Sequence, residues 1–114
     1  MDNLCAGDLV WVDFEPAFGH EHGGRRPALV MSVSPYNTRS SFVLVCPITR
    51  SRKTWPFHID LPDNCGIDGA IILDRLKSVD KRRIVSRVAG KRPQSDVEIL
   101  HERLASIVCL DPAQ

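Results

Sequence analysis

The sequence predicts a mainly β protein: a small, strongly bent antiparallel sheet or barrel of five to seven short strands, followed by one C-terminal α-helix. Two observations carry this prediction. Short runs rich in β-branched and apolar residues recur along most of the chain, separated by glycine, proline and other turn residues. Apolar residues at helical spacing then occur near its end. A series of strands followed by a single helix is typical of a bent sheet with one packed helix.

Five runs are clear strand candidates. They are, in chain order, 9–14, 28–33, 41–48, 57–61 and 69–73. The apolar run within 28–33 indicates burial on both faces. Residues 34–38 have turn composition, and Pro47 is expected to mark the end of the third strand or a sheet edge.

The remaining third of the chain is less regular until its final helix. Residues 74–80 alternate polar and apolar, which allows Leu76 and Val79 to face the core. A last short strand is expected within 81–92, anchored by Ile84, Val85 and Val88. The helix is predicted from a capping box formed by Ser95 and Glu98. Its apolar stripe comprises Val97, Leu100, Leu104, and Ile107 or Val108.

Length and composition indicate one ordinary globular domain, expected to span 1–114. Apolar residues make up 43% of the chain and charged residues 25%, which is the balance of a soluble protein. No run of about 18 apolar residues predicts a membrane span. The first residues lack the basic start and apolar core of a signal peptide. We therefore expect a cytoplasmic protein.

The four cysteines favour reduced, mostly buried thiols. Cys5, Cys46, Cys65 and Cys109 form no CxxC pair, and none lies near a histidine at metal-ligand spacing. A structural zinc or a disulfide framework is the weaker alternative. We expect no metal and no other cofactor.

The net charge of +1 conceals a strong asymmetry along the chain. Residues 1–24 hold five acids and no Lys or Arg, whereas residues 25–92 hold 14 Lys and Arg against five acids. The basic middle of the chain favours a polyanionic partner. The ordinary alternative is a solvated basic face.

A polar loop between the first two predicted strands is the leading candidate for a site. The loop, 17–26, carries Glu21 between His20 and His22, and the pair Arg25-Arg26 just before Pro27. A carboxylate and arginines between two apolar runs are typical of functional groups on a rigid scaffold. Each also has an ordinary interpretation: a solvated carboxylate, idle or metal-binding histidines, and an arginine paired with a nearby acid.

Three segments in register resemble the MazF/PemK (Kid) toxin family of bacterial toxin–antitoxin systems. The first begins with GDLVWVDFEP at Gly7 and continues through Gly19-His20-Glu21 to RPALV, which ends at Val30; the second is CPIT, 46–49; the third is DRLKSVD, 74–80. The resemblance extends over essentially the whole chain. It implies an SH3-like barrel with a terminal helix that acts as a homodimer. It also implies a metal-independent endoribonuclease that cuts single-stranded RNA, and a cognate antitoxin whose disordered, acidic C-terminal segment occupies the RNA groove.

The resemblance assigns Glu21, Arg26 and Thr49 to positions tied to catalysis. Without it, Thr49 would be interpreted as a turn residue or a cap. The third motif, which contains Lys77, Ser78 and Asp80, is expected near the groove. The chain departs from the family in the two histidines that flank Glu21, and in Arg75, where glutamine is frequent.

Metal-free cleavage of RNA needs a base for the ribose 2′-OH, cations at the phosphorane-like transition state, and an acid for the leaving 5′-oxygen. Glu21 is the candidate base, and His20 or His22 is the candidate acid. Arg26 matches a phosphate with its planar fork, and Thr49 would donate a hydrogen bond to a phosphate oxygen. The expected products are a 2′,3′-cyclic phosphate and a 5′-OH.

Further polar and aromatic residues are expected to bind the RNA. Trp55, close in sequence to several cations, is a candidate to stack on a base, although packing explains it equally well. The expected RNA-binding residues are His20, His22, Arg25, Arg50, Arg52, Lys53, Trp55, Arg75, Lys77 and Ser78.

Two other functions compete with the ribonuclease. One is a non-enzymatic toxin of the same fold that poisons a protein such as a topoisomerase; Glu21, Arg26 and Thr49 argue against it, because such a binder needs no catalytic groups. The other is a nucleic-acid-binding module without chemistry. RNA cleavage in EDTA separates both from the nuclease.

Overall fold

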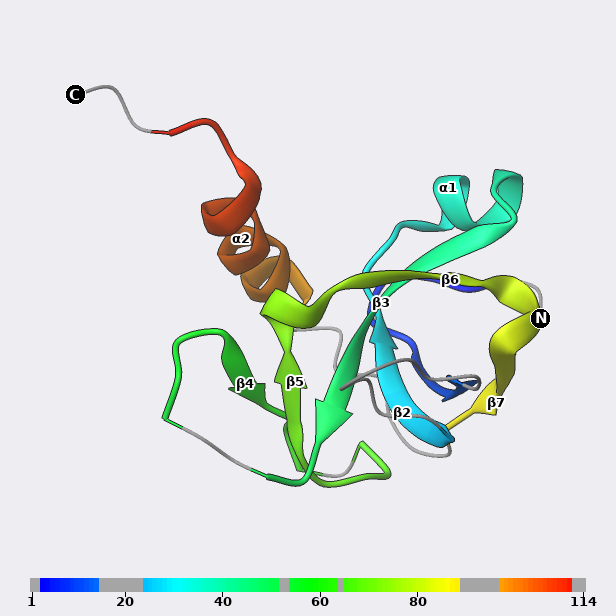
Figure 1. Cartoon of the computed structure of the whole chain (residues 1–114), viewed down its shortest axis with the longest axis horizontal. Coiled ribbons are helices and arrows are strands. Elements are labelled where there is room, and N and C mark those ends of the chain that lie inside the picture. Colours follow the sequence, from blue (N-terminus) through cyan, green and yellow to red (C-terminus); the bar gives the residue numbers. More distant parts are fainter. Residues whose placement is uncertain (1–2, 15–23, 52–53, 64, 89–96, 112–114) are drawn as a thin grey trace.

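Seven short strands, all paired antiparallel, and a C-terminal helix make up the computed structural model (Figure 1). The structure describes residues 3–14, 24–51, 54–63, 65–88 and 97–111. The strands are β1 (Leu9–Asp13), β2 (Arg25–Val30), β3 (Phe42–Thr49), β4 (His58–Asp60), β5 (Ala70–Ile72), β6 (Lys77–Asp80) and β7 (Ile84–Arg87). The helices are α1 (Ser34–Arg39) and α2 (Val97–Val108), with 3₁₀ turns η1 (Leu73–Arg75) and η2 (Lys81–Arg83). The prediction of a mainly β protein with a C-terminal helix is confirmed.

Strand β3 organises the sheet, because it pairs with three other strands. One of its edges pairs with β2, while its other edge pairs first with β6 and then with β5. The strand order is β4-β5-β3-β2-β1-β7, with β6 beside β3. The strands at the two ends of this order, β4 and β7, do not pair with each other, so the described strands form an open sheet. The predicted barrel therefore describes them only loosely.

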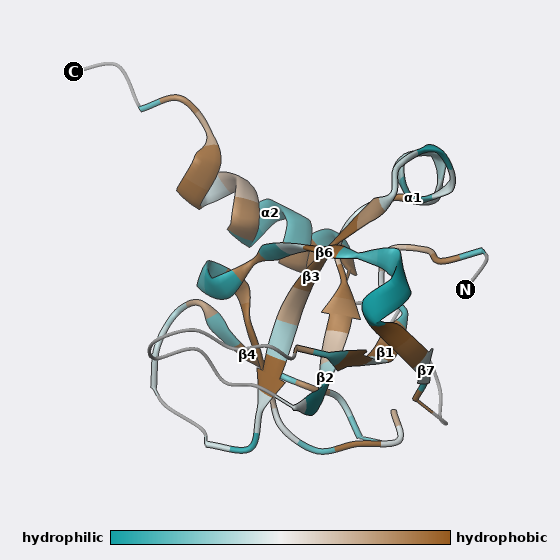
Figure 2. Ribbon diagram, turned by 45° about the vertical axis from the view of Figure 1, so that its right-hand side comes forward, coloured by the Kyte–Doolittle hydropathy of each residue, from teal (hydrophilic) through white to brown (hydrophobic). Residues whose placement is uncertain are grey.

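Alternating side chains of the same strands form two separate cores. Val10 and Val12 of β1, with Ala28 and Val30 of β2, belong to one core. Leu9 and Leu29, next to them in sequence, belong to the other, which also contains Leu100 of α2. Because both faces of the central strands are buried, their buried parts are apolar on both faces (Figure 2). The predicted burial of the run 28–33 is confirmed for residues 28–32 but is wrong for Val33, which lies beyond the end of β2 and is 51% exposed.

The sheet curls so that the valine-rich face becomes concave. Lys77 on β6 holds its ammonium group 5.1 Å from the ring centroid of Phe14, just after β1. Strands β3 and β2 lie between β6 and β1 in the sheet. Contact across two intervening strands requires strong curvature toward the face that Lys77 shares with the buried Val79.

Pro47 lies inside β3, so the prediction that it might end the strand is wrong; the strand runs to Thr49. The backbone of Leu44 faces β2, because its carbonyl accepts from Met31 N at 2.8 Å. By alternation, the backbone of Pro47 faces the other edge. There it lies between Val45, which pairs with β6, and Thr49, which pairs with β5. The missing N–H therefore falls where β3 changes its partner.

The segment predicted to be a turn at 34–38 is instead the short helix α1, with a proline in its first turn. Asn37 is buried, and its amide nitrogen donates to Leu4 O at 3.0 Å and to Ser32 O at 2.8 Å. Its amide oxygen accepts from the Ser32 hydroxyl. Residues of turn composition therefore form a helix because buried tertiary hydrogen bonds hold them.

Helix α2 covers the second core above β5, as Figure 1 shows. Leu100 is fully buried and Leu104 packs against the same core, as predicted, but Ile107 and Val108 are exposed. A Cβ on Gly7 would lie 2.6 Å from the Val97 side chain, so only glycine fits this contact. The predicted cap at Ser95 lies outside the described residues.

The structure also bears on the expectations for the cysteines and for a membrane span. Cys46 and Cys65 are buried, Cys5 is half-buried and Cys109 is exposed, and all four thiols are free. Within the described ranges, no helix has the length and apolar character needed to cross a membrane.

Candidate functional site

The β2 strand begins, and β3 ends, at the same end of the sheet, which is the lower end in Figure 1. These strands pair through Val30 with Val45, Leu29 with Cys46, and Ala28 with Pro47. Continuing this register by two residues places Arg26 opposite Thr49. The two residues therefore lie on one face of neighbouring strands, although they are distant in sequence.

Arg26 belongs to β2, where it pairs with Val12, and not to the loop in which it was predicted. The predicted end of the loop was wrong, because the pairing with β1 extends β2 back to Arg25; residues 17–23 of the loop lie outside the described residues. Arg26 shares its face with the buried Ala28 and Val30, so it stands at the end of the concave core. The side chain is exposed. The strand thus fixes its backbone while the guanidinium remains accessible.

Thr49 is the last residue of β3 and is half-buried. Its Oγ1 accepts a hydrogen bond from Ser51 N at 3.0 Å, which is the turn role expected of a lone threonine. A hydroxyl that accepts one bond still has its own proton to donate. The same side chain can therefore shape the turn and donate to a ligand.

Gly69 makes the position of Thr49 possible. A Cβ at Gly69 would lie 2.6 Å from the carbonyl oxygen of Thr49, and its φ of +147° is one that side chains disfavour. The backbone that leads into β5 therefore approaches the end of β3 as closely as only glycine allows.

Lys77 and Phe14 line the same concave face. Lys77 lies opposite Val45 on β3 and interacts with the Phe14 ring. Ser78, the next residue on β6, is exposed and points to the other face by alternation. The structure therefore groups Lys77 with Arg26 and Thr49 on one face and separates Ser78 from them.

Several predicted site residues lie outside the described residues: His20, Glu21, His22, Arg52 and Lys53. The described residues that flank the first three are Phe14 and Gly24. Phe14 N donates to Gly24 O at 2.9 Å, beside Arg26 and at the same end of the sheet. The sequence that contains Glu21 therefore connects two strand ends at this site.

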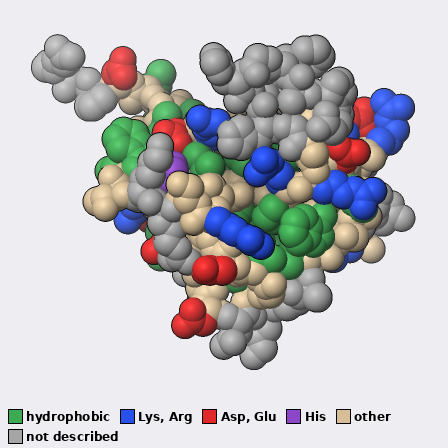
Figure 3. Space-filling model, turned by 60° about the horizontal axis from the view of Figure 1, so that its bottom comes forward, with side chains coloured by type: hydrophobic (Ala, Val, Ile, Leu, Met, Phe, Trp, Pro, Cys, Tyr) green, Lys and Arg blue, Asp and Glu red, His purple; other side chains and the backbone are tan. Residues whose placement is uncertain are grey.

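Cationic side chains gather at this end of the molecule. Arg25, Arg26 and Arg50 are all exposed. Figure 3, which brings the lower end of Figure 1 forward, shows Lys and Arg side chains around a patch of hydrophobic side chains. An apolar patch flanked by cations suits a ligand that carries both phosphates and bases.

Trp55 and Arg75 lie toward the other edge of the sheet. Trp55 precedes the edge strand β4, and its indole Nε1 donates to Asp74 at 2.9 Å. Arg75 follows Asp74 in η1 and is exposed. The structure thus places Trp55 next to the third sequence motif, a link that the sequence does not reveal.

Two titratable groups are unsuited to proton transfer. Hydrogen bonds from the Arg82 side chain and backbone lower the pKa of Asp80 to about 2, so this carboxylate stays ionised. Burial, reinforced by the charge of Asp74, raises the pKa of the Cys46 thiol to about 12. Within the described ranges, no group of three or more His, Cys, Asp or Glu side chains is placed to hold a metal ion.

Three contributors to the site were not singled out from the sequence as site residues: Phe14, Gly69 and Asp74. Phe14 continues the alternation of Val10 and Val12, so the strand pattern indicated that its side chain lies on the same face as theirs. Gly69 and Asp74 act through Thr49 and Trp55, which are distant in sequence, and no local pattern indicates either contact.

Comparison with protein-family models gives a match over residues 6–108 to the PemK-like, MazF-like toxins of type II toxin–antitoxin systems. Among characterised proteins, the chain is similar to the endoribonuclease toxin MazF of Escherichia coli strain K12. The two are 31% identical over 102 residues, which cover 90% of this chain and 91% of that protein.

Solved structures show the same similarity. The crystal structure of MazF from Deinococcus radiodurans superposes with a TM-score of 0.81 at 36% identity, over 94% of this chain and 97% of that chain. A MazE–MazF crystal structure from the same organism gives a TM-score of 0.79 at 35% identity, over 95% and 97% of the two chains.

Proposed function

Because the chain belongs to the PemK-like, MazF-like toxin family of type II toxin–antitoxin systems, we propose that it is an endoribonuclease toxin that cleaves single-stranded RNA at short sequences without a metal ion. One structural observation supports this activity most directly. Arg26 and Thr49 come to the same end and the same face of two neighbouring strands. A phosphate placed there would meet a guanidinium and a hydroxyl donor together.

The reaction is a transfer within the RNA itself. The ribose 2′-oxygen loses its proton to Glu21 and bonds to the adjacent phosphorus. The bond from phosphorus to the 5′-oxygen breaks, and His20 or His22 protonates the leaving oxygen. The products are a 2′,3′-cyclic phosphate and a 5′-OH, and no water is consumed in this step.

Arg26 and Thr49 stabilise the charge that develops on the phosphorane-like transition state. The planar guanidinium of Arg26 can contact two phosphate oxygens at once. Thr49 donates its hydroxyl proton to a phosphate oxygen while its Oγ1 still accepts from Ser51 N. Because both are strand residues, their backbones need little reorganisation as charge develops.

The cations around this end hold the RNA backbone. Lys77 shares the concave face with Arg26, and its ammonium group is oriented by Phe14. Arg25, Arg50 and Arg75 supply exposed charge farther out, and Arg52 and Lys53 belong to the same basic segment of sequence. Phosphate contacts of this kind add affinity without reading the base sequence.

The proposed partners follow from the charge of the site and from the family. A solved structure from D. radiodurans contains MazE together with MazF. We propose that a cognate antitoxin inhibits this chain by laying an acidic, disordered C-terminal segment on the same cations. The toxin acts as a homodimer in the cytoplasm, where its RNA substrates are.

Incubating the purified protein with a long single-stranded RNA in EDTA tests the proposal. We expect new 5′ ends at one short recurring sequence. Intact RNA from a folded sample would contradict the nuclease and favour a toxin that poisons a protein target or a binding module without chemistry.

A further inference from the structure

Trp55 is an exposed aromatic residue that the structure holds in one orientation. Its indole Nε1 donates to Asp74 Oδ2 at 2.9 Å, and its ring meets Phe57 edge to face with the centroids 5.7 Å apart. Its carbonyl accepts from His58 N at 3.0 Å, and the next carbonyl, of Pro56, accepts from Arg103 of α2 at 2.8 Å. Even so, 47% of the residue remains exposed.

The hydrogen bond to Asp74 satisfies the only polar group of the indole. What remains open to solvent is aromatic surface, which water solvates poorly and a nucleobase can stack on. Asp74 directs its carboxylate to Trp55 and not to the adjacent Arg75. Within the described part of the chain, Arg75 makes no hydrogen bond or ion pair.

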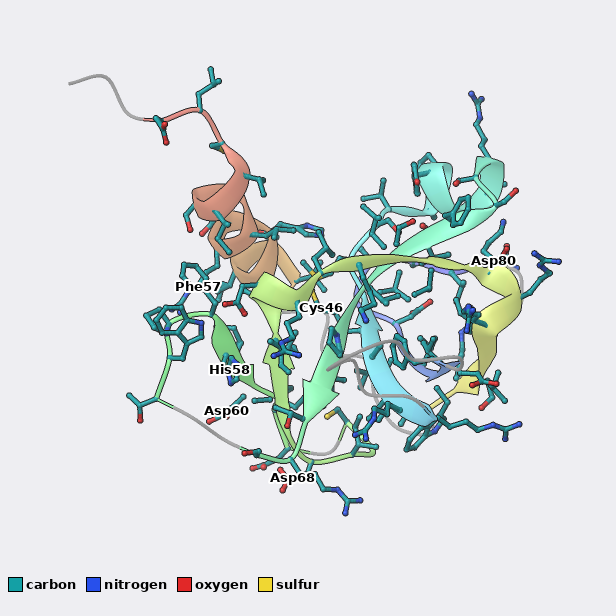
Figure 4. The ribbon with its side chains drawn as sticks, in the orientation of Figure 1. Cys46, Phe57, His58, Asp60, Asp68 and Asp80 are labelled. Atoms are coloured by element: carbon teal, nitrogen blue, oxygen red, sulfur yellow. The ribbon has the colours of Figure 1, made fainter. Side chains whose placement is uncertain are left out.

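The position of Trp55 suits the same RNA strand that reaches the cleavage site. Trp55 follows the end of β3 by a short connection that begins at Thr49, so the two lie at most about 20 Å apart along the chain. Figure 4 shows Phe57, which contacts Trp55, at the β4 edge of the molecule, well away from Asp80. Arg50, next to Thr49, and Arg75, next to Asp74, are both exposed and offer a phosphate contact near each of the two points.

We propose that Trp55 stacks on an unpaired base of the RNA, and that Asp74 and Phe57 position its indole for this contact. The proposal rests on the proposed ribonuclease function and extends it. The enzyme would bind an RNA base that lies outside the dinucleotide at which the RNA is cut. Trp55 contacts the substrate, whereas Asp74 acts only through Trp55.

Charge gives a sharp way to test the role of Asp74. Removing a carboxylate near a polyanion strengthens binding if only electrostatics matters. The stacking proposal predicts the opposite for Asp74→Ala, since the indole loses its fixed orientation. Asp63→Ala is the matched control, because Asp63 is also exposed and its removal changes the net charge equally.

The measurement is the affinity for a 2′-O-methyl copy of the RNA used in the cleavage assay, which binds but cannot react. Trp55→Ala should weaken binding by about 5- to 150-fold. Asp74→Ala should weaken it by less, Asp74→Asn should restore it because the amide oxygen still accepts from Nε1, and Asp63→Ala should not weaken it. In a Trp55→Phe background, Asp74→Ala should no longer weaken binding, because no indole N–H remains for Asp74 to hold.

Kinetics and fluorescence separate this role from a structural one. In Trp55→Ala the KM should rise while kcat stays within about twofold, because the contact is formed in both ground and transition states. The chain has two tryptophans, Trp11 in β1 and Trp55, so each single Phe variant reports on the other one. RNA should quench tryptophan fluorescence in Trp11→Phe but not in Trp55→Phe.

Each adverse outcome has a separate meaning. Unchanged affinity in Trp55→Ala, or affinity in Asp74→Ala equal to or above that of the wild type, would overturn the stacking role while leaving the ribonuclease intact. A wild-type protein that neither cleaves the RNA nor binds its methylated copy would overturn both proposals.

Discussion

At the scale of single residues, Arg26 combines a fixed backbone with an accessible charge. Strand β2 holds it opposite Val12 on β1, and its side chain is exposed at the end of the concave face. A phosphate that binds there meets a donor whose strand is already ordered, so the cost of ordering is small. This is why we assign the largest catalytic effect to Arg26 among the described residues.

Replacing Arg26 with alanine is therefore expected to lower kcat for RNA cleavage by at least about 100-fold, the range found for loss of one preorganised transition-state donor. Single-turnover cleavage of one RNA measures it. Arg39→Ala on α1 is the control: it removes the same charge from an exposed residue at the other end of the molecule (Figure 1). Equal rates for the two variants would contradict the assignment.

The residue scale also shows what sequence could and could not predict. The family motifs singled out Arg26, Thr49 and Lys77, and the structure groups all three on one face. The hydrogen bond of Asp74 to Trp55 joins residues with no common motif. Contacts of this kind depend on how strands meet, which local patterns do not encode.

At the scale of secondary-structure elements, the end of β3 is shaped by its contact with the start of β5. Gly69 allows this contact, because its φ of +147° and lack of a Cβ let it approach the carbonyl of Thr49. The position of Thr49, the proposed donor to a phosphate, is thus set by a glycine just before a neighbouring strand.

The substitution Gly69→Ala should lower both stability and activity. A Cβ placed 2.6 Å from the Thr49 carbonyl must move one of the two strands, and the backbone conformation is strained for alanine. We expect a loss of about 1–3 kcal/mol in the free energy of unfolding, measured by urea denaturation, and a lower kcat in the folded protein. Unchanged values of both would show that the contact is not constrained.

Helix α1 illustrates how tertiary contacts override local composition. Its proline, asparagine and serine predict a turn, yet Asn37 binds Leu4 and Ser32 within the fold and the segment becomes helical. Strand β2 likewise begins earlier than predicted, because β1 pairs with Arg25 and Arg26. The sequence predicted the order of strands and the final helix, whereas these boundaries depend on partners distant in the chain.

We expect Asn37→Ala to destabilise the protein while leaving catalysis intact. The change leaves the buried carbonyls of Leu4 and Ser32 without their donor, which costs about 1–3 kcal/mol. Thr38→Ala is the control, since Thr38 is exposed on the same helix. Comparing urea midpoints tests the stability; a lower kcat at temperatures where the variant is folded would link α1 to the site instead.

At the scale of the whole molecule, the charge distribution matters more than the net charge of +1. Arg25 and Arg26 of β2 and Arg50 after β3 lie at one end, and Lys77 of β6 shares the concave face with Arg26, although Asp13 also lies at this end, opposite Arg25. In our proposal, the same positive charges attract both the RNA and the acidic segment of an antitoxin. The two would then compete for one surface without a separate regulatory site.

Binding of non-cleavable single-stranded RNA should consequently weaken steeply with salt. The slope of log K against log salt concentration is about −0.7 for each phosphate neutralised on a single strand. We expect Arg50→Ala to make the slope less negative by about 0.7, and Arg39→Ala to leave it unchanged. A slope near zero for the wild-type protein would contradict an electrostatic RNA surface.

The chemistry of the cleaved ends tests the central claim most directly. Single-stranded RNA would be digested in EDTA, and mass spectrometry would identify both new termini. The account predicts a 2′,3′-cyclic phosphate and a 5′-OH, because the 2′-oxygen attacks the adjacent phosphorus. A 5′-phosphate, or cleavage that requires an added metal ion, would contradict it.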